Sequence, residues 1–168
     1  GTGILTLSGA DTLANYQQVL RTVTYNNTSQ DPDTTARSVT FVVNDGAADS
    51  NIATTTVTVL GVNDAPVIDL DANDSTSTGA NFAATFSEDS GGVVIADSDA
   101  TITDIDNTNL QSLTITITNL LDGAAEALDA DVSGTAIAKS YDSGTGILTL
   151  SGADTLANYQ QVLRTVTY

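Results

Sequence analysis

Residues 1–25 of this chain, GTGILTLSGADTLANYQQVLRTVTY, recur unchanged as residues 144–168, and we call this sequence the duplicated segment. The two copies begin 143 positions apart, which predicts a tandem array whose repeating unit has that length. In such an array reach, stiffness and avidity increase with the number of units, whereas one active site needs only one scaffold. The repetition therefore favours a structural or adhesive protein over an enzyme.

The composition predicts an all-β fold. Hydrophobic residues make up 40% of the 168 residues, which is enough for a core. They are mainly Val, Ile, Leu and Ala, accompanied by many Thr residues. Because β-branched side chains suit the pleated surface of a sheet, this palette favours strands over helices. One domain per repeat is the simplest domain count.

Acidic residues dominate the charge, since 21 Asp and Glu residues stand against 4 Lys and Arg residues, for a formal net charge of −17. A charge of this size repels nucleic acids and anionic lipids, so we expect neither nucleic-acid binding nor membrane insertion. The acidity by itself has two interpretations. One is a solvated surface, and the other is a set of divalent-cation sites, because Ca²⁺ prefers carboxylate and carbonyl oxygens.

The residue types that are missing exclude several kinds of catalysis. The chain contains no Cys and no His, which removes Cys/His zinc sites, thiol chemistry and Ser-His-Asp triads. Two carboxylate pairs, Glu88 with Asp89 and Asp104 with Asp106, have the residue types of a glycosidase. They stand in strand-to-turn segments without an aromatic platform. We therefore interpret them as cation ligands and expect no enzymatic activity.

Alternation of apolar and polar residues predicts strands over residues 37–43, 53–60 and 113–118. Further strands are expected at 4–7, 21–25, 67–70, 82–86, 93–95 and 135–140. Turn residues such as Asn44-Asp45-Gly46 separate these segments. Many short strands with frequent turns favour a β-sandwich.

The duplicated segment also contains a helical pattern. Asp154 is a candidate helix cap, and Leu156, Tyr159 and Leu163 then lie on one face of a short helix over residues 154–163. The same helix is expected at residues 11–20. A second, Ala- and Leu-rich helix is predicted at residues 121–129.

A linker is predicted at Gly61-Val62-Asn63-Asp64-Ala65-Pro66, because Pro66 favours an extended Ala65 and cannot donate to a strand ladder. We therefore expect residues 1–60 to be the C-terminal part of one repeat, 61–66 a calcium-binding linker, and 67–168 the N-terminal part of the next. Each part alone is an incomplete sandwich with unpaired edges. We expect it to belong to a longer polypeptide, or to join other copies head to tail by strand complementation.

At Asn63-Asp64-Ala65-Pro66 the chain resembles the cadherin-like repeats that are strung in tandem through giant bacterial surface proteins and adhesins. LANYQQVLRTVTY followed by SVTFVVNDG is similar, more loosely, to chondroitin-sulfate-proteoglycan-type repeats. The resemblance implies Greek-key cadherin-like β-sandwich repeats with a short helix insertion. It also implies Ca²⁺ at the joints between repeats, and an extracellular or cell-surface location in a secreted bacterial protein.

The resemblance further implies metal ligands at the positions of the family's acidic motifs. In this chain they are Asp11, Asp45, Asn63, Asp64, Glu88, Asp104, Asp106 and Asp154. The family's joint motif is abbreviated, with Gly61 at its first acidic position. After Asp154, Thr and Leu stand where the family has Arg and Glu.

The spacing of two acidic pairs bears on this expectation without the family. Asp104 and Asp106, at i and i+2, can turn into one concavity where a divalent ion relieves their repulsion, although a plain polar turn has the same spacing. Asp69-x-Asp71-x-Asn73 has the spacing with which a Ca²⁺ loop begins. Asp74 replaces the loop glycine and no glutamate ends the loop, so a turn is the favoured interpretation there.

The leading functional hypothesis is a structural extender, an adhesive repeat of a giant filament protein whose joints are made rigid by calcium. Its partners are neighbouring repeats of the same protein, head to tail, and other surface proteins or glycans. The alternative is a module that binds carbohydrate or another cell directly. Sugar sites usually carry stacking aromatic residues, yet Trp is absent and we expect Tyr16, Tyr25 and Tyr141 to be core or edge residues.

Overall fold

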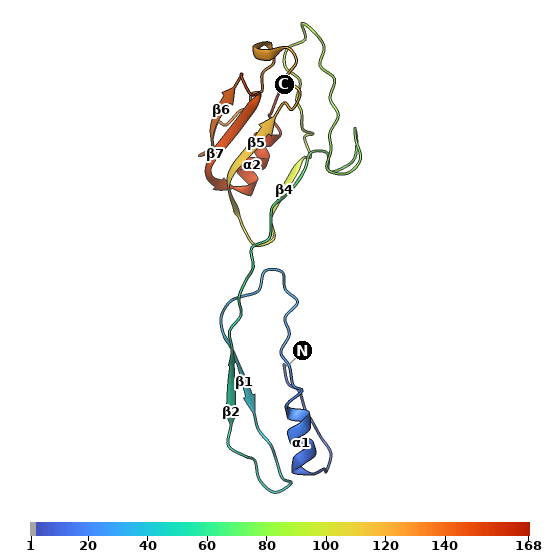
Figure 1. Cartoon of the computed structure of the whole chain (residues 1–168), viewed down its shortest axis with the longest axis vertical. Coiled ribbons are helices and arrows are strands. Elements are labelled where there is room, and N and C mark those ends of the chain that lie inside the picture. The colour runs from blue at the N-terminus through green and yellow to red at the C-terminus, as the bar shows by residue number, and fades with distance from the viewer. Residues whose placement is uncertain (1–2) are drawn as a thin grey trace. The chain divides into compact units, whose positions relative to one another are not determined.

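The computed structural model describes residues 3–168, and the chain divides into two compact units, unit 1 (Gly1–Val59) and unit 2 (Leu60–Tyr168). The fold is mainly β, with small antiparallel sheets and two short helices (Figure 1). The boundary between the units lies beside the predicted linker. Neither helix in residues 3–168 has the length and apolar character needed to cross a lipid bilayer.

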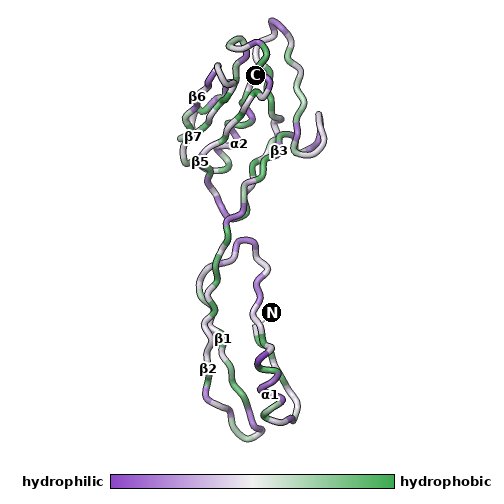
Figure 2. The backbone as a smooth tube through the Cα atoms, in the orientation of Figure 1, coloured by the Kyte–Doolittle hydropathy of each residue, from purple (hydrophilic) through white to green (hydrophobic). Residues whose placement is uncertain are grey.

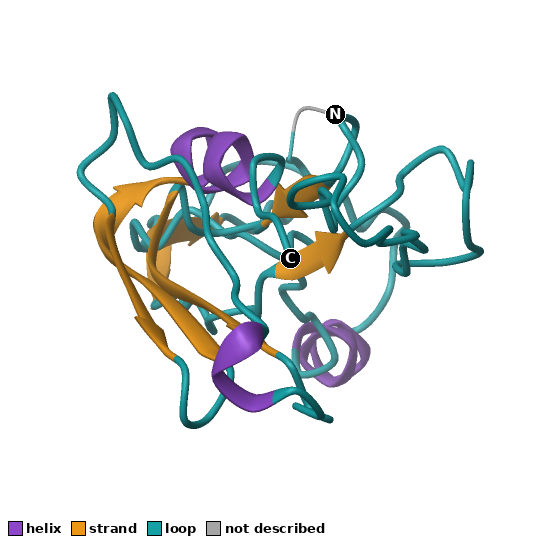
Figure 3. Cartoon of the chain, turned by 90° about the horizontal axis from the view of Figure 1, so that it is seen from above, coloured by secondary structure: helices purple, strands orange, loops and turns teal. Residues whose placement is uncertain are grey.

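Unit 2 contains two antiparallel sheets. The smaller sheet pairs β3 (Val67–Asp69) with β4 (Thr101–Thr103). The larger sheet is formed by β5 (Asn109–Thr116), β6 (Ala138–Asp142) and β7 (Ile147–Thr155), with β7 in the centre. A single 3₁₀ turn, η1 (Gly123–Ala125), lies between β5 and β6, and α2 (Leu156–Leu163) follows β7 directly (Figures 1 and 3).

The core of unit 2 is built on the second copy of the duplicated segment. Leu148 and Leu150 alternate along β7 and are 1% and 0% exposed, as expected for the inner face of a strand. From α2, Tyr159 and Val162 lie on the helix face that packs on β4, β5 and β7, and both are fully buried. Apolar residues recur at every second position in β7 and at every third or fourth position in α2. These spacings place them on the facing sides of the two elements, in one cluster.

Unit 1 consists of α1 (Leu13–Leu20) and a two-stranded antiparallel ladder of β1 (Arg37–Phe41) and β2 (Ala53–Val57). None of its described residues, 3–59, is buried. The unit nevertheless contains hydrophobic segments, which Figure 2 colours green. Its Ile4 and Leu13 are 77% and 83% exposed, and Leu60, the first residue of unit 2, is 81% exposed. Residues 3–59 therefore contain a helix and a strand pair but no buried core.

The two copies of the duplicated segment share their local hydrogen bonds. Thr12 caps α1 by accepting a hydrogen bond from Asn15 N, and Thr155 caps α2 by accepting one from Asn158 N. The Tyr16 hydroxyl donates to a backbone carbonyl seven residues earlier, and its counterpart does the same in the second copy. The helix and its cap are therefore specified locally, by the duplicated segment itself.

The strand in this segment is not specified locally. Residues 147–155 form β7, with β5 on one side and β6 on the other, whereas the identical residues 4–12 form no strand. A strand consists of hydrogen bonds to its neighbours, so the same letters become a strand only where partner strands are present. The first-copy prediction of a strand at 4–7 is therefore wrong, and its second-copy counterpart is β7.

Several other predicted elements differ from the structure. Residues 21–25 and 82–86 form no strand, 93–95 contribute a single bridge from Val94 to Thr167, and β4 was not predicted. Residues 121–129 contain η1 as their helical structure and a β-bridge from Asp129 to Thr167, since the positive φ of Gly123 interrupts the helical conformation at its start. The cap of α2 is Thr155 and not Asp154, whose Oδ1 instead accepts from Thr155 N.

The cap of α2 provides the first testable prediction. Replacing Thr155 with alanine removes the side-chain acceptor for Asn158 N and should destabilise unit 2 by about 1 kcal/mol in urea unfolding followed by circular dichroism. Thr155→Ser keeps the hydroxyl and should recover most of the loss. Equal stability of the alanine variant and the original chain would contradict this role of Thr155.

Candidate metal centre

The first acidic cluster lies where the chain enters unit 2. Asp64 N donates to Oδ2 of Asp106 over 3.0 Å, and Asn107 Nδ2 donates to Asn63 Oδ1 over 3.0 Å. Asp104 Oδ1 accepts from the backbone N–H groups of Asp106 and Asn107, at 3.2 and 2.9 Å. We call Asn63, Asp64, Asp104, Asp106 and Asn107 the entry cluster. It brings together four of the eight predicted ligands, from segments some 40 residues apart in the sequence.

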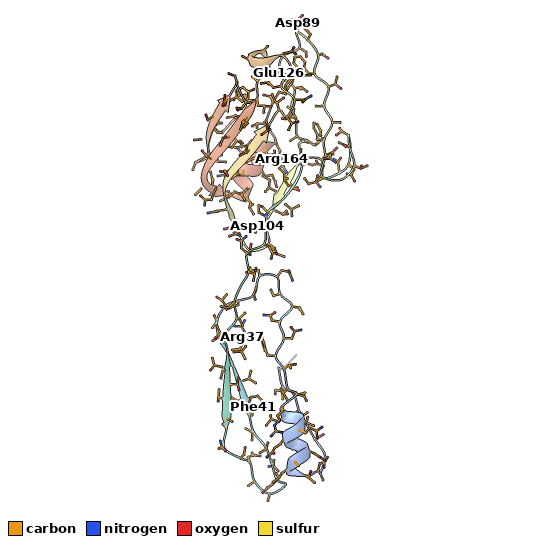
Figure 4. The ribbon with its side chains drawn as sticks, viewed as in Figure 1. Arg37, Phe41, Asp89, Asp104, Glu126 and Arg164 are labelled. Atoms are coloured by element: carbon orange, nitrogen blue, oxygen red, sulfur yellow. The ribbon has the colours of Figure 1, made fainter. Side chains whose placement is uncertain are left out.

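Asp104 is the most constrained carboxylate of the entry cluster. Its partial burial raises the pKa, but hydrogen bonds from Asp106 and Asn107 outweigh that effect, so its pKa lies below the ordinary value. The hydrogen bonds to its side chain use Oδ1. Asp104 is thus ionised at neutral pH and has Oδ2 available to a cation. Figure 4 places Asp104 at one end of unit 2.

A second acidic cluster consists of Asp71, Asp97 and Asp99, which we call the loop cluster. One carboxylate oxygen from each lies within 4.8 Å of those of the other two, so this cluster could hold a metal ion. Asp71 follows β3, and Asp97 and Asp99 precede β4, so the pairing of β3 with β4 brings them together. Asp97 N donates to the carbonyl of Leu70, which fixes the two segments to each other.

The hydrogen bonds of Asp71 argue for a structural role within this cluster. Asp71 is fully buried, and its two oxygens accept hydrogen bonds from Ser75, Thr76 and Ser77 through three backbone N–H groups and two hydroxyls. A carboxylate offers about four lone-pair sites, so these donors already use its accepting capacity. Asp71 therefore closes the loop at 71–77 without any ion, as the turn interpretation of this segment expects.

The electrostatics of Asp71 agree with that role. Burial raises its pKa, but hydrogen bonds from Thr76 and then Ser75 outweigh the burial, and the pKa lies far below the ordinary range of aspartate. At Asp97, hydrogen bonds from Asp99 and Ser98 lower the pKa against partial burial and the nearby charge of Asp71. Asp71 and Asp97 are therefore ionised at neutral pH although the loop cluster contains no cationic side chain.

The remaining predicted ligands belong to neither cluster and form hydrogen bonds of their own. Asp45 accepts from the N–H groups of Ala47 and Ala48, both at 2.9 Å, as the first residue of a turn. Asp154 accepts from Ala136 N at 2.7 Å and from Asn158, and Asp11 makes the equivalent local bonds in unit 1. Glu88 is exposed in a turn, and Figure 4 places its neighbour Asp89 at the opposite end of unit 2 from Asp104.

Sequence reasoning missed the participation of Asp97 and Asp99. The signal was present, because the two residues have the same i and i+2 spacing that singled out Asp104 and Asp106. What the spacing did not reveal was the partner, since Asp71 reaches them only through the pairing of β3 with β4.

Three polar side chains elsewhere in unit 2, those of Lys139, Glu126 and Tyr141, form hydrogen bonds within the fold. Lys139 Nζ donates to Oδ1 of the exposed Asp129 and to the carbonyl of the buried Ala130. Glu126 accepts from the N–H groups of Leu121 and Asp122, and from the Tyr168 hydroxyl at 2.9 Å. Tyr141 donates to the carbonyl of Glu126, so its hydroxyl is used within the fold.

Comparison with protein-family models, with curated proteins and with solved structures finds no match to this chain. The functional argument therefore depends on the chain's own repetition, burial and charge.

Proposed function

We propose that this chain is an extender segment of a repetitive extracellular protein, in which domains of one kind follow each other and hold a distal binding region away from a bacterial surface. The observation that carries the proposal is the unchanged recurrence of the duplicated segment, once in each unit. A unique catalytic or recognition site would not require the same 25-residue sequence in both units. In the complete array each unit is a Greek-key β-sandwich of the cadherin-like kind.

Calcium stiffens this array by binding at the entry cluster. The cluster ties the segment around Asn63 and Asp64 to the turn that contains Asp104 and Asp106, through the 3.0 Å hydrogen bond from Asp64 N to Asp106. Ca²⁺ coordinates carboxylate and carbonyl oxygens in flexible geometry, so an ion here would add a further bridge between two segments that lie just beyond the β3–β4 ladder. We favour the entry cluster over the loop cluster because the carboxylate oxygens of Asp71 already accept five hydrogen bonds.

The calcium proposal predicts a ligand-dependent melting temperature. With a dissociation constant typical of extracellular modules, roughly 10⁻⁴ to 10⁻³ M, Ca²⁺ at a hundred times that value stabilises unit 2 by about 2.7 kcal/mol. For a unit of this size the melting temperature should rise by on the order of 10 °C. The measurement is thermal unfolding of the whole chain in Ca²⁺ and in chelator, at constant ionic strength so that charge screening is matched.

Paired variants identify the site. Asp104→Asn with Asp106→Asn should abolish the rise, while Asp97→Asn with Asp99→Asn should leave it intact. If the second pair abolished the rise and the first did not, the ion would belong to the loop cluster. An original chain whose melting temperature is the same in Ca²⁺ and chelator would refute calcium stiffening altogether.

A further inference from the structure

The apolar face of the duplicated segment is open in the first copy, whereas the same face is covered in the second copy. Leu5 and its counterpart Leu148 are 68% and 1% exposed, and Leu7 and Leu150 are 42% and 0% exposed. On the helices, Val19 is 44% exposed and its counterpart Val162 is fully buried. Since the sequences are identical, the difference comes entirely from what lies against them.

Unit 2 shows what covers this face. β7 is held between β5 and β6, with Leu148 opposite Ile115 and Tyr141 in the two ladders. Polar contacts fix the helix as well, because Gln160 Oε1 accepts from Ile102 N at 3.1 Å and Arg164 Nε donates to the carbonyl of Ala100 at 3.0 Å. All of these partners lie within residues 67–143, which we call the acceptor region.

We propose that the acceptor region of one copy of this chain binds residues 3–25 of a second copy, in the place that its own residues 144–168 occupy. The occupant is specified by identity, since the incoming segment has the same sequence as the one that the acceptor region already binds. This inference rests on the proposed serial arrangement of like units, but it does not depend on calcium. It assigns an interaction surface to unit 1, whose described residues have no core of their own.

The helical part of residues 3–25 already matches the bound form, and the strand over residues 4–12 forms only on binding. The helix, its Thr12 cap and the left-handed conformation of Gly9 (φ 129°, against 128° for Gly152) are in place before any partner is present. The helix therefore needs little ordering on binding, and ordering is the usual cost of docking a free segment. The incoming segment also continues into β1, whose half-buried Val39 and Phe41 add a surface that residues 144–168 do not themselves carry.

A glycine distinguishes docking from nonspecific association. At Gly152 an added Cβ would lie 2.7 Å from the carbonyl oxygen of Ala136, which is too close for any real side chain, whereas at Gly9 nothing lies within 4 Å. Once docked, Gly9 of the second copy takes the position of Gly152, against Ala136 in the acceptor region of the first copy. Gly9→Ala should therefore block docking while unit 2 of the same chain remains unchanged.

Disulfide trapping tests the proposal in the whole chain, which contains no Cys of its own. Thr114 lies directly opposite Thr149 in the ladder of β5 and β7, and Thr6 is the first-copy counterpart of Thr149. Opposite residues of an antiparallel ladder lie within the Cα separation that a disulfide accepts. A chain with Thr6→Cys, mixed with a tagged chain with Thr114→Cys, should form a crosslinked heterodimer under mild oxidation.

Residues 144–168 of the acceptor chain compete for the same place at an effective concentration near millimolar, and they must dissociate before a second copy can bind. The mixture is therefore warmed close to the melting temperature and cooled before oxidation. Each chain is used at about 0.5 mM, which is comparable to that effective concentration. The yield of crosslinked heterodimer should be at least about tenfold higher than in a control mixture in which Ser87→Cys replaces Thr114→Cys. Thr114→Cys with Thr149→Cys in one chain is the positive control for the geometry. Adding Gly9→Ala to the Thr6→Cys chain should return the heterodimer to the control level.

Three outcomes would overturn the proposal: no heterodimer, equal crosslinking to Ser87→Cys, or full crosslinking with Gly9→Ala. The experiment is run in chelator, so that its result is separate from that of calcium binding. A heterodimer without any effect of calcium on melting would refute only calcium stiffening. A calcium effect without the heterodimer would refute only this docking.

Discussion

Replacing Leu148 with alanine lowers the free energy of unfolding of unit 2 by about 3 kcal/mol, whereas the same replacement at Leu5 changes it by less than about 0.5 kcal/mol. Leu148 is 1% exposed in the centre of the unit 2 core, so the change removes buried methyl groups and leaves a cavity. Leu5 has the same sequence neighbours and is 68% exposed, so truncation there removes almost no buried surface.

The measurement is urea unfolding followed by circular dichroism and tyrosine fluorescence, because the chain has no Trp. For a unit of this size the total stability is roughly 5–15 kcal/mol, so the Leu148 variant loses a large share of it. The melting temperature should fall by on the order of 10 °C. The comparison is well controlled, since both variants change the same residue within an identical sequence.

Equal effects at the two positions would contradict the burial described for unit 2. A large loss at Leu5 alone would mean that unit 1 has a core that its described residues do not show. Leu150→Ala with Leu7→Ala repeats the comparison one pleat further along the strand, at residues 0% and 42% exposed. The same order of effects is expected there.

The sequence predicted those parts of the fold in which the pattern is local. Alternation over residues 37–43 and 53–60 predicted β1 and β2, and the spacing of Leu156, Tyr159 and Leu163 predicted α2. Pattern alone failed for residues 4–7, because whether they form a strand depends on β5 and β6 being available. No property of the duplicated segment could distinguish its two copies, which makes this the clearest limit of sequence reasoning in the chain.

The candidate site was predicted in part for the same reason. The spacing of Asp104 and Asp106 indicated a shared turn, and the resemblance named Asn63 and Asp64. The structure shows that hydrogen bonds join these two segments across some 40 residues. The burial of Asp71 could not be read from the sequence, since an aspartate in an Asp- and Ser-rich loop is usually exposed. Its burial follows from the loop at 71–77 folding back so that five donors converge on one carboxylate.

Replacing Asp71 with asparagine should lower the melting temperature of unit 2 by roughly 10 °C at pH 7. One oxygen of Asp71 accepts from Ser75, and the other accepts from Thr76 and Ser77. An asparagine in the same position presents an NH₂ group to one of these sets, so donors face donors in a buried site. Asp74→Asn is the control, because Asp74 lies in the same loop, is exposed, and has a φ of 54°, which asparagine tolerates.

The pH dependence of the Asp71 effect has a definite sign. The pKa of Asp71 is depressed in the folded unit, so its contribution to stability is fully present above the unfolded pKa of about 3.9 and is lost as the pH falls toward the folded pKa. The original chain should therefore lose stability on acidification below about pH 4, and Asp71→Asn lacks this part of the loss. The difference in melting temperature between the two should shrink steadily from about pH 4 to about pH 2. A difference as large at the acidic end of this range as at neutral pH would mean that Asp71 stabilises the loop by its shape and not as an ionised acceptor.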